Sequence, residues 1–179
     1  MTEGEKRREG IIKRLSTADA PVSGTELAKE FKVSRQVIVQ DVALLRAEDR
    51  GILSTYRGYV LQKNTGREGS CIRVFSVDHT TEDTLDELQT IVDCGGRVLD
   101  VSVEHRLYGQ IRADLIINNR LDAAEFTEQM ARCTDQPMKA LTGGCHYHTV
   151  AAPSERNLDR IEEELRKKGY LMKKEAVMV

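Results

Sequence analysis

The stretch "GTELAKEFKVSRQVIVQDVALLRAEDRGILSTYRGYVL", residues 24–61, determines how the first third of the chain folds. Just before it stands Ser23, with Glu26 three residues on. This is the spacing of a capping box, in which the two side chains satisfy free backbone N–H groups, and it predicts a helix over residues 24–31. An earlier helix is expected over residues 7–15, because "STADAPVSG" contains the proline and glycine that end one.

A third helix and a hairpin complete the pattern. After the "KVS" turn, Ser34 can cap a helix, and its apolar residues recur at the spacing of one helix face. They are Ile38, Val42 and Leu45. The following "GILSTYRGYVL" reads as strands over residues 52–55 and 59–61, joined at Arg57-Gly58. Three helices and a hairpin predict a winged helix.

The face opposite this apolar stripe suits DNA. A helix fits the major groove, and polar or cationic groups near its N-terminus can reach base edges and phosphates. The residues expected to contact DNA are Ser34, Arg35, Gln36, Val39 and Gln40, with Arg57 at the hairpin tip as the wing residue. The alternative is a small helical domain with an ordinary solvated face.

The same stretch, including "VSRQ" and "RGYVL", resembles the helix-turn-helix module of biotin-repressor-like regulators. This resemblance favours DNA binding. The charge balance agrees: residues 1–67 hold thirteen Lys/Arg against nine Asp/Glu, net +4, whereas the whole chain has net charge −2. A basic N-terminal part of the chain is suited to an anionic partner such as double-stranded operator DNA.

Composition limits the class of protein. The chain of 179 residues is 40% hydrophobic and 31% charged, which is typical of a soluble globular protein. The charged N-terminus and the lack of a long apolar segment predict a cytoplasmic protein with no membrane association. The four cysteines form no CxxC pair, so they predict neither a disulfide framework nor a cysteine zinc site.

A second domain is expected after a polar, glycine-rich linker, "QKNTGREGS", over residues 62–70. The predicted domains are residues 1–63, the winged helix, and residues 69–179. In the second domain helices and strands alternate in the order βαββαβ, followed by a helix and a closing strand over residues 170–179. This order favours an α+β fold: an α/β sandwich with a mostly antiparallel sheet and helices on one face.

Two histidines mark the candidate site of this domain. In "CHYHTV", His146 and His148 share one face of a predicted strand, while Cys145 and Tyr147 face the other. Two imidazoles can converge on a transition metal, but they rarely hold it without further ligands. His79 is a candidate third ligand, and Glu87 or Glu82 a candidate fourth. The alternative is a pair of histidines on ordinary strand surface.

The stretches "SVDHTTEDTLDELQTIVDCGGRVLDVSVEHRLYGQI" and "LTGGCHYHTV" resemble the 3H domain, which is named for its histidines. Joined to this helix-turn-helix, the chain is similar to the NiaR family of niacin-responsive transcriptional repressors. That resemblance implies repression of NAD-biosynthesis or niacin-uptake genes, nicotinic acid as co-repressor, and one divalent metal ion (zinc, nickel or iron). By position, the implied metal ligands are His79, Glu87, His146 and His148.

Two further residues are assigned to the effector. His105 matches another histidine of the domain, and Tyr108 lies nearby in sequence as a second polar candidate. A proline is usual where Arg106 stands, so this turn departs from the family pattern. Palindromic reading of DNA predicts a homodimer, in which effector binding resets the spacing of the recognition helices to one helical turn or a multiple, about 34 Å.

Two other functions remain open at this stage. One is a metal-dependent hydrolase with an appended DNA-binding domain, for which Glu82 or Glu104 could serve as general base. The other is a DNA-binding module with a purely structural metal. No nucleotide-binding or nucleophile motif is present in the second domain, so we expect no enzyme activity.

Overall fold

The computed structural model describes residues 2–62 and 70–172. The chain divides into two compact units, Met1–Gly66 and Arg67–Val179, and each is described by itself. All but the two end residues of the predicted linker, residues 62–70, lie outside the described residues.

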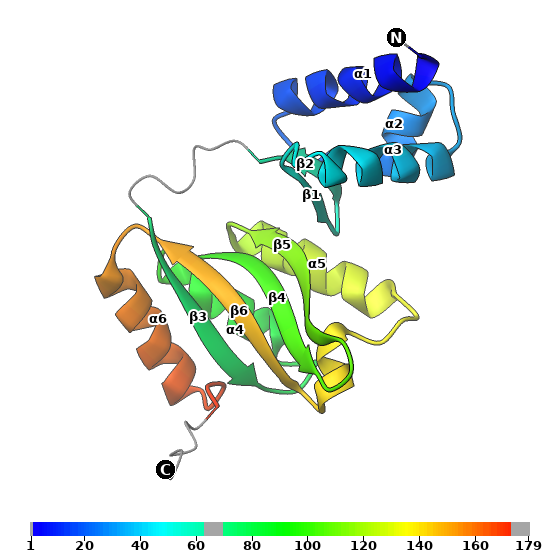
Figure 1. Ribbon diagram of the computed structural model, residues 1–179. Coiled ribbons are helices and arrows are strands. Elements are labelled where there is room, and N and C mark those ends of the chain that lie inside the picture. The colour runs from blue at the N-terminus through cyan, green and yellow to red at the C-terminus, as the bar shows by residue number, and fades with distance from the viewer. Residues whose placement is uncertain (1, 63–69, 173–179) are drawn as a thin grey trace. The chain divides into compact units, whose positions relative to one another are not determined.

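The first unit contains three helices followed by a hairpin (Figure 1). Its elements are α1 (Glu3–Thr17), α2 (Gly24–Glu30), α3 (Arg35–Ala47), β1 (Ile52–Thr55) and β2 (Gly58–Leu61). The predicted helix over residues 7–15 is longer in the structure, because Thr2 and Glu5 form a capping box that starts α1 at Glu3. The expected winged helix is present.

Capping differs in one detail from the prediction for α2. Ser23 accepts a hydrogen bond from the backbone N–H of Glu26 at 3.1 Å, as expected of an N-cap. The Glu26 carboxylate does not return to the cap; it accepts from Arg14 of α1 at 3.1 Å. The reciprocal half of the predicted box is therefore wrong, because a guanidinium within reach offers the exposed carboxylate a charge-assisted partner.

The wing is tied to the helices by backbone hydrogen bonds. Val22 and Tyr59 exchange both N–H···O bonds, at 2.8 and 2.9 Å, so the segment before α2 pairs with β2. Gly58 makes this approach possible: its φ is 138°, and a Cβ there would collide with the Val22 backbone. Buried apolar residues from the helices and β1 form the core beneath. They are Ile11, Leu15, Val22, Leu27, Ala28, Ile38, Val42, Leu45 and Ile52.

Replacing Gly58→Ala is expected to destabilise the chain by about 1–3 kcal/mol, because the added methyl forces the wing away from Val22. Urea denaturation followed by circular dichroism would measure the change. Gly51→Ala is the matched control: its φ is also positive, at 64°, but its nearest neighbour lies 3.7 Å from the added Cβ. Equal losses from the two variants would contradict the argument from the close approach.

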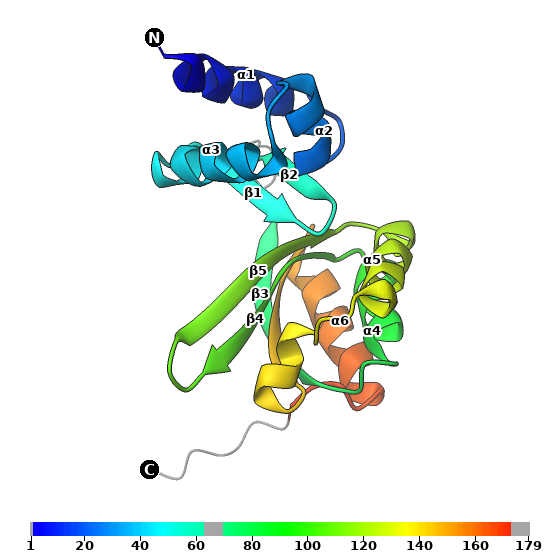
Figure 2. The ribbon, with the colours of Figure 1, turned by 90° about the vertical axis from the view of Figure 1, so that its right-hand side faces the viewer.

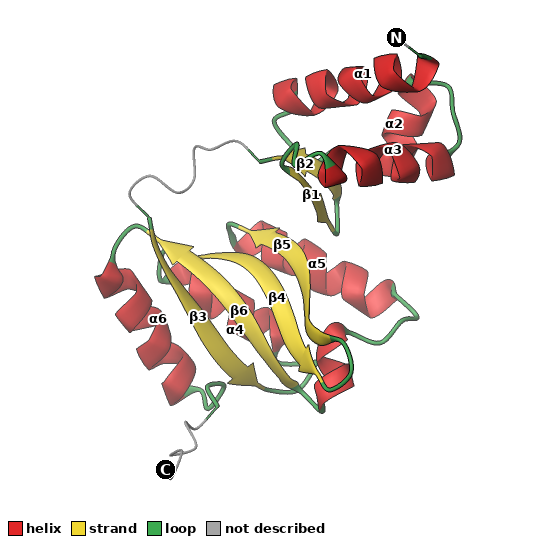
Figure 3. Ribbon diagram, viewed as in Figure 1, coloured by secondary structure: helices red, strands yellow, loops and turns green. Residues whose placement is uncertain are grey.

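The second unit is one four-stranded sheet with three helices (Figure 3). Its elements are β3 (Cys71–Asp78), α4 (Thr84–Asp93), β4 (Arg97–His105), β5 (Gly109–Ile117), α5 (Arg120–Arg132), η2 (Met138–Thr142), β6 (Cys145–Ala152) and α6 (Glu155–Lys167). The strand order is β3-β6-β4-β5, and all neighbours pair antiparallel. The 3₁₀ helix η2 was not predicted, because its five residues show no periodicity.

All three long helices cover one face of this sheet (Figure 2). The core between them consists of apolar side chains from alternate strand positions and from the inner helix faces. They include Phe75, Val77, Leu88, Ile91, Val98, Val103, Leu115, Ile117, Val150, Leu158, Ile161 and Leu165. The predicted α+β sandwich with helices on one face is confirmed.

The closing strand is seen only at its beginning. Leu171 forms an isolated antiparallel bridge with Val77, and Met172 N–H donates to the carbonyl of Ser76 at 3.0 Å. The rest of the predicted strand, residues 173–179, lies outside the described residues. Within the described part of the chain, no helix has the length and apolar composition that a membrane span requires.

Candidate metal centre and DNA interface

His146 and His148 project from β6 onto the helix-covered face of the sheet. His146 pairs with the buried Val77 of β3, and both histidines are themselves buried, at 3% and 4% exposure. The intervening positions face the other way: Cys145 pairs with the exposed Asp78, and its Sγ lies 3.7 Å from that carboxylate. The thiol therefore points away from the imidazoles.

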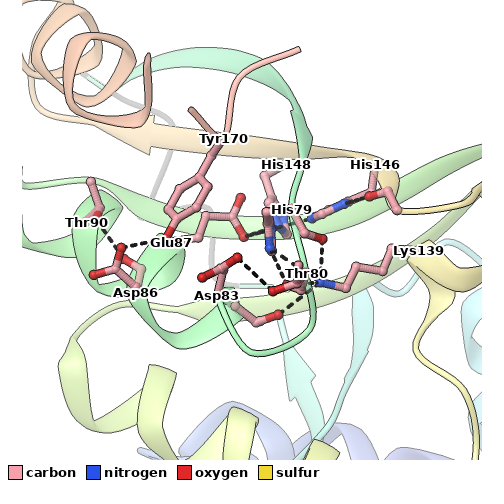
Figure 4. Close-up of polar contacts among 12 residues, drawn as sticks. His79, Thr80, Asp83, Asp86, Glu87, Thr90, Lys139, His146, His148 and Tyr170 are labelled. Atoms are coloured by element: carbon pink, nitrogen blue, oxygen red, sulfur yellow. Dashed lines mark hydrogen bonds and ion pairs between the residues drawn. The ribbon is translucent and has the colours of Figure 1, made fainter. Parts of the chain in front are cut away.

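His79 and Glu87 bring two more donor groups to the same place (Figure 4). His79 follows directly after β3, and Glu87 lies in the first turn of α4, where the helix dipole favours a carboxylate. Measured from Glu87 Oε2, the imidazole Nε2 atoms lie at 2.7 Å for His79, 3.5 Å for His148 and 3.9 Å for His146. Four side chains, from β6, from α4 and from the connection after β3, thus converge.

The second nitrogen of each imidazole has a carbonyl neighbour that favours one tautomer of the ring, and Nδ1 of His79 also lies 3.4 Å from Lys139 Nζ. Each Nδ1 lies within hydrogen-bond distance of a backbone carbonyl, which can only accept a proton. The pairs are His79 with Thr80 at 2.7 Å, His146 with Gly144 at 2.7 Å, and His148 with Asp100 at 2.9 Å. With the proton on Nδ1, each neutral ring turns the lone pair of Nε2 toward Glu87. Three lone pairs and a carboxylate then face one another.

Such a group requires a positive charge. Among the described residues, neither oxygen of Glu87 has a hydrogen bond of good geometry, and the side chain is completely buried. Burial alone would raise the pKa of this carboxyl, but the positive charge of His148 and the hydrogen bonds that His146, His148 and His79 donate when protonated lower it well below its usual range. A buried anion surrounded by imidazole lone pairs is the environment that a divalent cation satisfies.

The donor set fits a transition metal ion. His79, Glu87 and His146 each offer a ligand atom, and these atoms all lie within 4.8 Å of one another. Imidazole and carboxylate ligands suit zinc, nickel and iron alike, so the set does not select one of them. Glu82, the alternative to Glu87 in the sequence, is exposed and is not part of the group.

Metal affinity is expected to rise with pH across the neutral range. Burial would lower the pKa of His148, but the charge of Glu87 and its hydrogen bond raise it above the ordinary value of a histidine. A proton on His148 competes with the metal below that pKa, so Kd should fall about tenfold per pH unit there and level off above it. Competition titrations from pH 6 to 8 would measure this, and a flat profile would contradict it.

Asp100 supports His148 from β4. The strands shift register between Val98 and Asp100, a bulge after which Asp100 pairs with Thr149 and Val101 with His148. Its carbonyl accepts from His148, while its carboxylate accepts from Thr149 N–H at 3.3 Å and pairs with Arg112 at 2.8 Å. Asp100 thus binds the backbone of β6 and also orients the ring of His148. Groups that hydrogen-bond to metal ligands commonly orient them in this way.

Tyr170 and Lys139 hold His79 from two sides. The Tyr170 ring lies 5.3 Å from that of His79, and its hydroxyl donates to Asp86 at 2.8 Å. Burial of the Tyr170 hydroxyl raises its pKa, and the hydrogen bond to the Asp86 carboxylate raises it further. Lys139 Nζ lies 2.8 Å from the carbonyl of Thr80 and 3.3 Å from that of His79. The segment between β3 and α4 is therefore fixed by contacts from the chain's last third.

A small pocket opens beside the two histidines. It is lined mainly by apolar side chains of α4, α5, β4, β5 and the start of η2, together with four polar ones. The polar groups are Thr84, Lys139, His146 and His148, and the apolar ones are Leu88, Val101, Leu115, Phe126, Met130, Pro137 and Met138. An apolar wall with a few polar groups is typical of a small-molecule site.

The structure places His105 and Tyr108 at the β4–β5 turn. Their rings stack at 5.0 Å, and His105 Nδ1 accepts from the backbone N–H groups of Leu107 and Tyr108. Tyr108 is 73% exposed, and neither residue lines the pocket beside His146 and His148. In the described structure, their contacts order the hairpin tip rather than join the four convergent side chains.

The residues predicted to contact DNA lie on α3 and the wing. Arg35, Gln36 and Gln40 are exposed, whereas Val39 is half-buried. Ser34 accepts from Val37 N–H at 3.3 Å, so its hydroxyl caps the helix. Arg57 is at the hairpin tip, with its guanidinium 5.4 Å from the Tyr56 ring centre. A helix with an exposed polar face and a cationic group at its N-terminal end is suited to the major groove.

Lys139 and Asp100 were not identified from the sequence. Lys139 follows Pro137 in a stretch without periodicity, which contains no signal that its side chain is buried. Asp100 could have been noticed, because it is a charged residue inside the apolar "RVLDVSV" strand. A charge at such a position commonly has a specific partner.

Comparison with known proteins covers both units. Residues 72–174 match the family model of the 3H domain, and residues 7–60 match a helix-turn-helix domain. The chain is 41% identical over 171 residues to a probable transcription repressor NiaR of Thermotoga maritima, with 96% of each chain covered. It is 36% identical over 171 residues to the transcription repressor NadR of Bacillus subtilis, with 95% of each covered.

Proposed function

We propose, since the chain belongs to the family of transcription repressors that join a helix-turn-helix to a 3H domain, that it represses NAD-biosynthesis or niacin-uptake genes in response to nicotinic acid. Both relatives are named as transcription repressors, and the chain, like them, is not an enzyme. The hydrolase alternative is therefore set aside.

One observation carries the effector part of this proposal. His146 and His148, two of the four convergent side chains, also line the apolar pocket. A small ring in that pocket would lie directly beside the metal ligands. When bound, a divalent ion offers a pyridine nitrogen or a carboxylate oxygen a position to coordinate. Nicotinic acid carries both groups on a flat, apolar ring.

The chain's own residues would prepare this site. The carbonyls of Thr80, Gly144 and Asp100 hold the three imidazoles in the tautomer that presents Nε2, and Glu87 supplies the negative charge. Phe126 and Met130 of α5 form part of the apolar wall. Because α4 and α5 both contribute to the pocket, a bound ring would fix their spacing, and that change is what the DNA-binding unit would sense.

The experiment is a fluorescence-anisotropy titration of the full chain with DNA from upstream of niacin genes. It is run with and without nicotinic acid, and with and without a chelator. We expect nicotinic acid to tighten binding at least about tenfold, a typical allosteric coupling, and chelation to remove that gain. Tightening that survives complete metal removal would contradict a role of the metal in sensing.

A purely structural metal is the competing function. The four side chains are only 0–5% exposed, which is the character of a closed structural site. On that reading, chelation would weaken DNA binding equally with and without nicotinic acid. The same titration therefore separates the two functions.

We further propose that the chain acts as a homodimer. Helix-turn-helix repressors commonly read two half-sites, and effector binding would set the spacing of two α3 helices to one helical turn or a multiple, about 34 Å. Binding to a full palindrome should then be much tighter than binding to one half-site. Equal affinity for the two DNAs would count against the dimer.

A further inference from the structure

Lys139 is a buried ammonium whose hydrogen-bond acceptors, among the described residues, are uncharged. It lies in η2, is 7% exposed, and donates to the carbonyls of Thr80 and His79 and to the hydroxyl of Thr84 at 3.2 Å, while Nδ1 of His79 lies 3.4 Å away (Figure 4). All of these acceptors are neutral. Among the described residues, no carboxylate lies within ion-pair distance of its Nζ.

Neutral acceptors do not require a lysine. A glutamine amide can also donate to two carbonyl oxygens, without the cost of burying a charge. Burial does lower the pKa of Lys139, while Glu87 and Asp83 oppose that shift, so acidic groups stabilise the ammonium from a distance. The local hydrogen bonds therefore do not by themselves require a charge at this position.

The pocket places this charge beside the candidate metal centre. Lys139, His146 and His148 line the same cavity, and the rest of its wall is almost entirely apolar. Three neutral imidazoles and one carboxylate leave a divalent ion with a single net positive charge. With Lys139 nearby, the wall of an otherwise apolar pocket then carries two positive charges. An anion entering there is attracted strongly, because the surroundings screen poorly.

We infer that Lys139 makes this pocket select an anionic aromatic acid over the neutral amide of the same shape. The inference rests on the proposed function, since it concerns the effector of the same site. An acid and its amide differ little in size, so an apolar wall cannot separate them. A fixed positive charge can separate them, because only the acid gains a charge-assisted interaction.

The experiment measures the dissociation constants of nicotinic acid and nicotinamide for the metal-loaded full chain. The variants are Lys139→Gln, which keeps donors for the loop carbonyls, and Lys139→Arg, which keeps the charge. Lys167→Met removes an exposed charge from α6 and is the matched control. Metal content is measured for each protein. A lysine that only stabilised the connection between β3 and α4, which carries His79, would change metal content rather than selectivity.

We expect the wild-type chain to prefer the acid by at least about tenfold, the size of a charge-assisted hydrogen bond. Lys139→Gln should lose at least about tenfold of that preference and keep its metal, whereas Lys139→Arg and Lys167→Met should retain the preference. An unchanged preference in metal-loaded Lys139→Gln overturns the inference. Loss of the metal in Lys139→Gln also overturns it, since Lys139 would then act by stabilising the metal centre.

Failure of the proposed function gives a different result. If the wild-type chain binds neither molecule, the pocket is not an effector site and the proposed function fails. If it binds both equally, effector sensing is retained and only the role of Lys139 is wrong.

Discussion

Replacing Glu87→Gln is expected to lower the affinity for a divalent transition metal by more than about 100-fold, beyond what second-shell changes cost. The amide has the shape of the carboxylate but lacks its negative charge, which would attract the cation that the three imidazoles help to bind. Its NH₂ group can also donate to those lone pairs, which would occupy the atoms that should bind the metal. Competition with a chromophoric chelator would measure the affinity, and metal content after dialysis would support it.

Glu82→Gln is the matched control for this variant. It removes the same charge from the connection just before α4, but its side chain is exposed and stands outside the convergent group. Its metal affinity should stay within about threefold of the wild-type value, because the field of an exposed charge is screened. Equal losses from the two variants would mean that general charge, rather than ligation, holds the metal.

Replacing Arg35→Ala is expected to weaken operator binding by about 1–3 kcal/mol, a change in Kd of roughly 5- to 150-fold. Arg35 is exposed in the first turn of α3, where a recognition helix contacts base edges or phosphates. Anisotropy titrations on operator DNA and on an unrelated duplex would separate the two contacts. A base contact loses affinity mainly on the operator, whereas a phosphate contact loses it on both.

Arg132→Ala serves as the control for charge. It removes one exposed positive charge from α5, where the guanidinium pairs only with the exposed Glu128. Its effect on DNA affinity should be within about 0.5 kcal/mol, as for most surface substitutions. If Arg35→Ala resembled this control, α3 would not be the DNA-reading helix.

The winged helix could be read almost completely from local sequence. Ser23 and Ser34 cap the helices at which the sequence places them, and Ile38, Val42 and Leu45 are buried as their spacing predicts. What the sequence could not decide was competition between partners. Glu26 had both a backbone N–H and the guanidinium of Arg14 as possible partners, and the packing of α1 beside α2 selected the guanidinium.

The candidate metal centre shows the limit of local reasoning more clearly. Strand alternation was enough to place His146 and His148 on one face, because side chains on a strand repeat every two residues. The choice between Glu82 and Glu87 depended on packing, because Glu82 precedes α4 and is exposed, whereas Glu87 lies on the buried side of α4. His105 and Tyr108 stack on each other at the tip of the β4–β5 hairpin, and they do not line the pocket beside His146 and His148.

The sequence by itself determined two domains' worth of secondary structure, the polar face of the third helix, and the pairing of two histidines on one strand. These follow from periodicity and capping, which act over a few residues. Only the tertiary structure brought His79 and Glu87 to that strand, turned the Asp100 carbonyl toward His148, and buried Lys139 beside them. These contacts join residues about 50 to 70 positions apart, and the antiparallel order β3-β6-β4-β5 and its bulge decide which side chains meet.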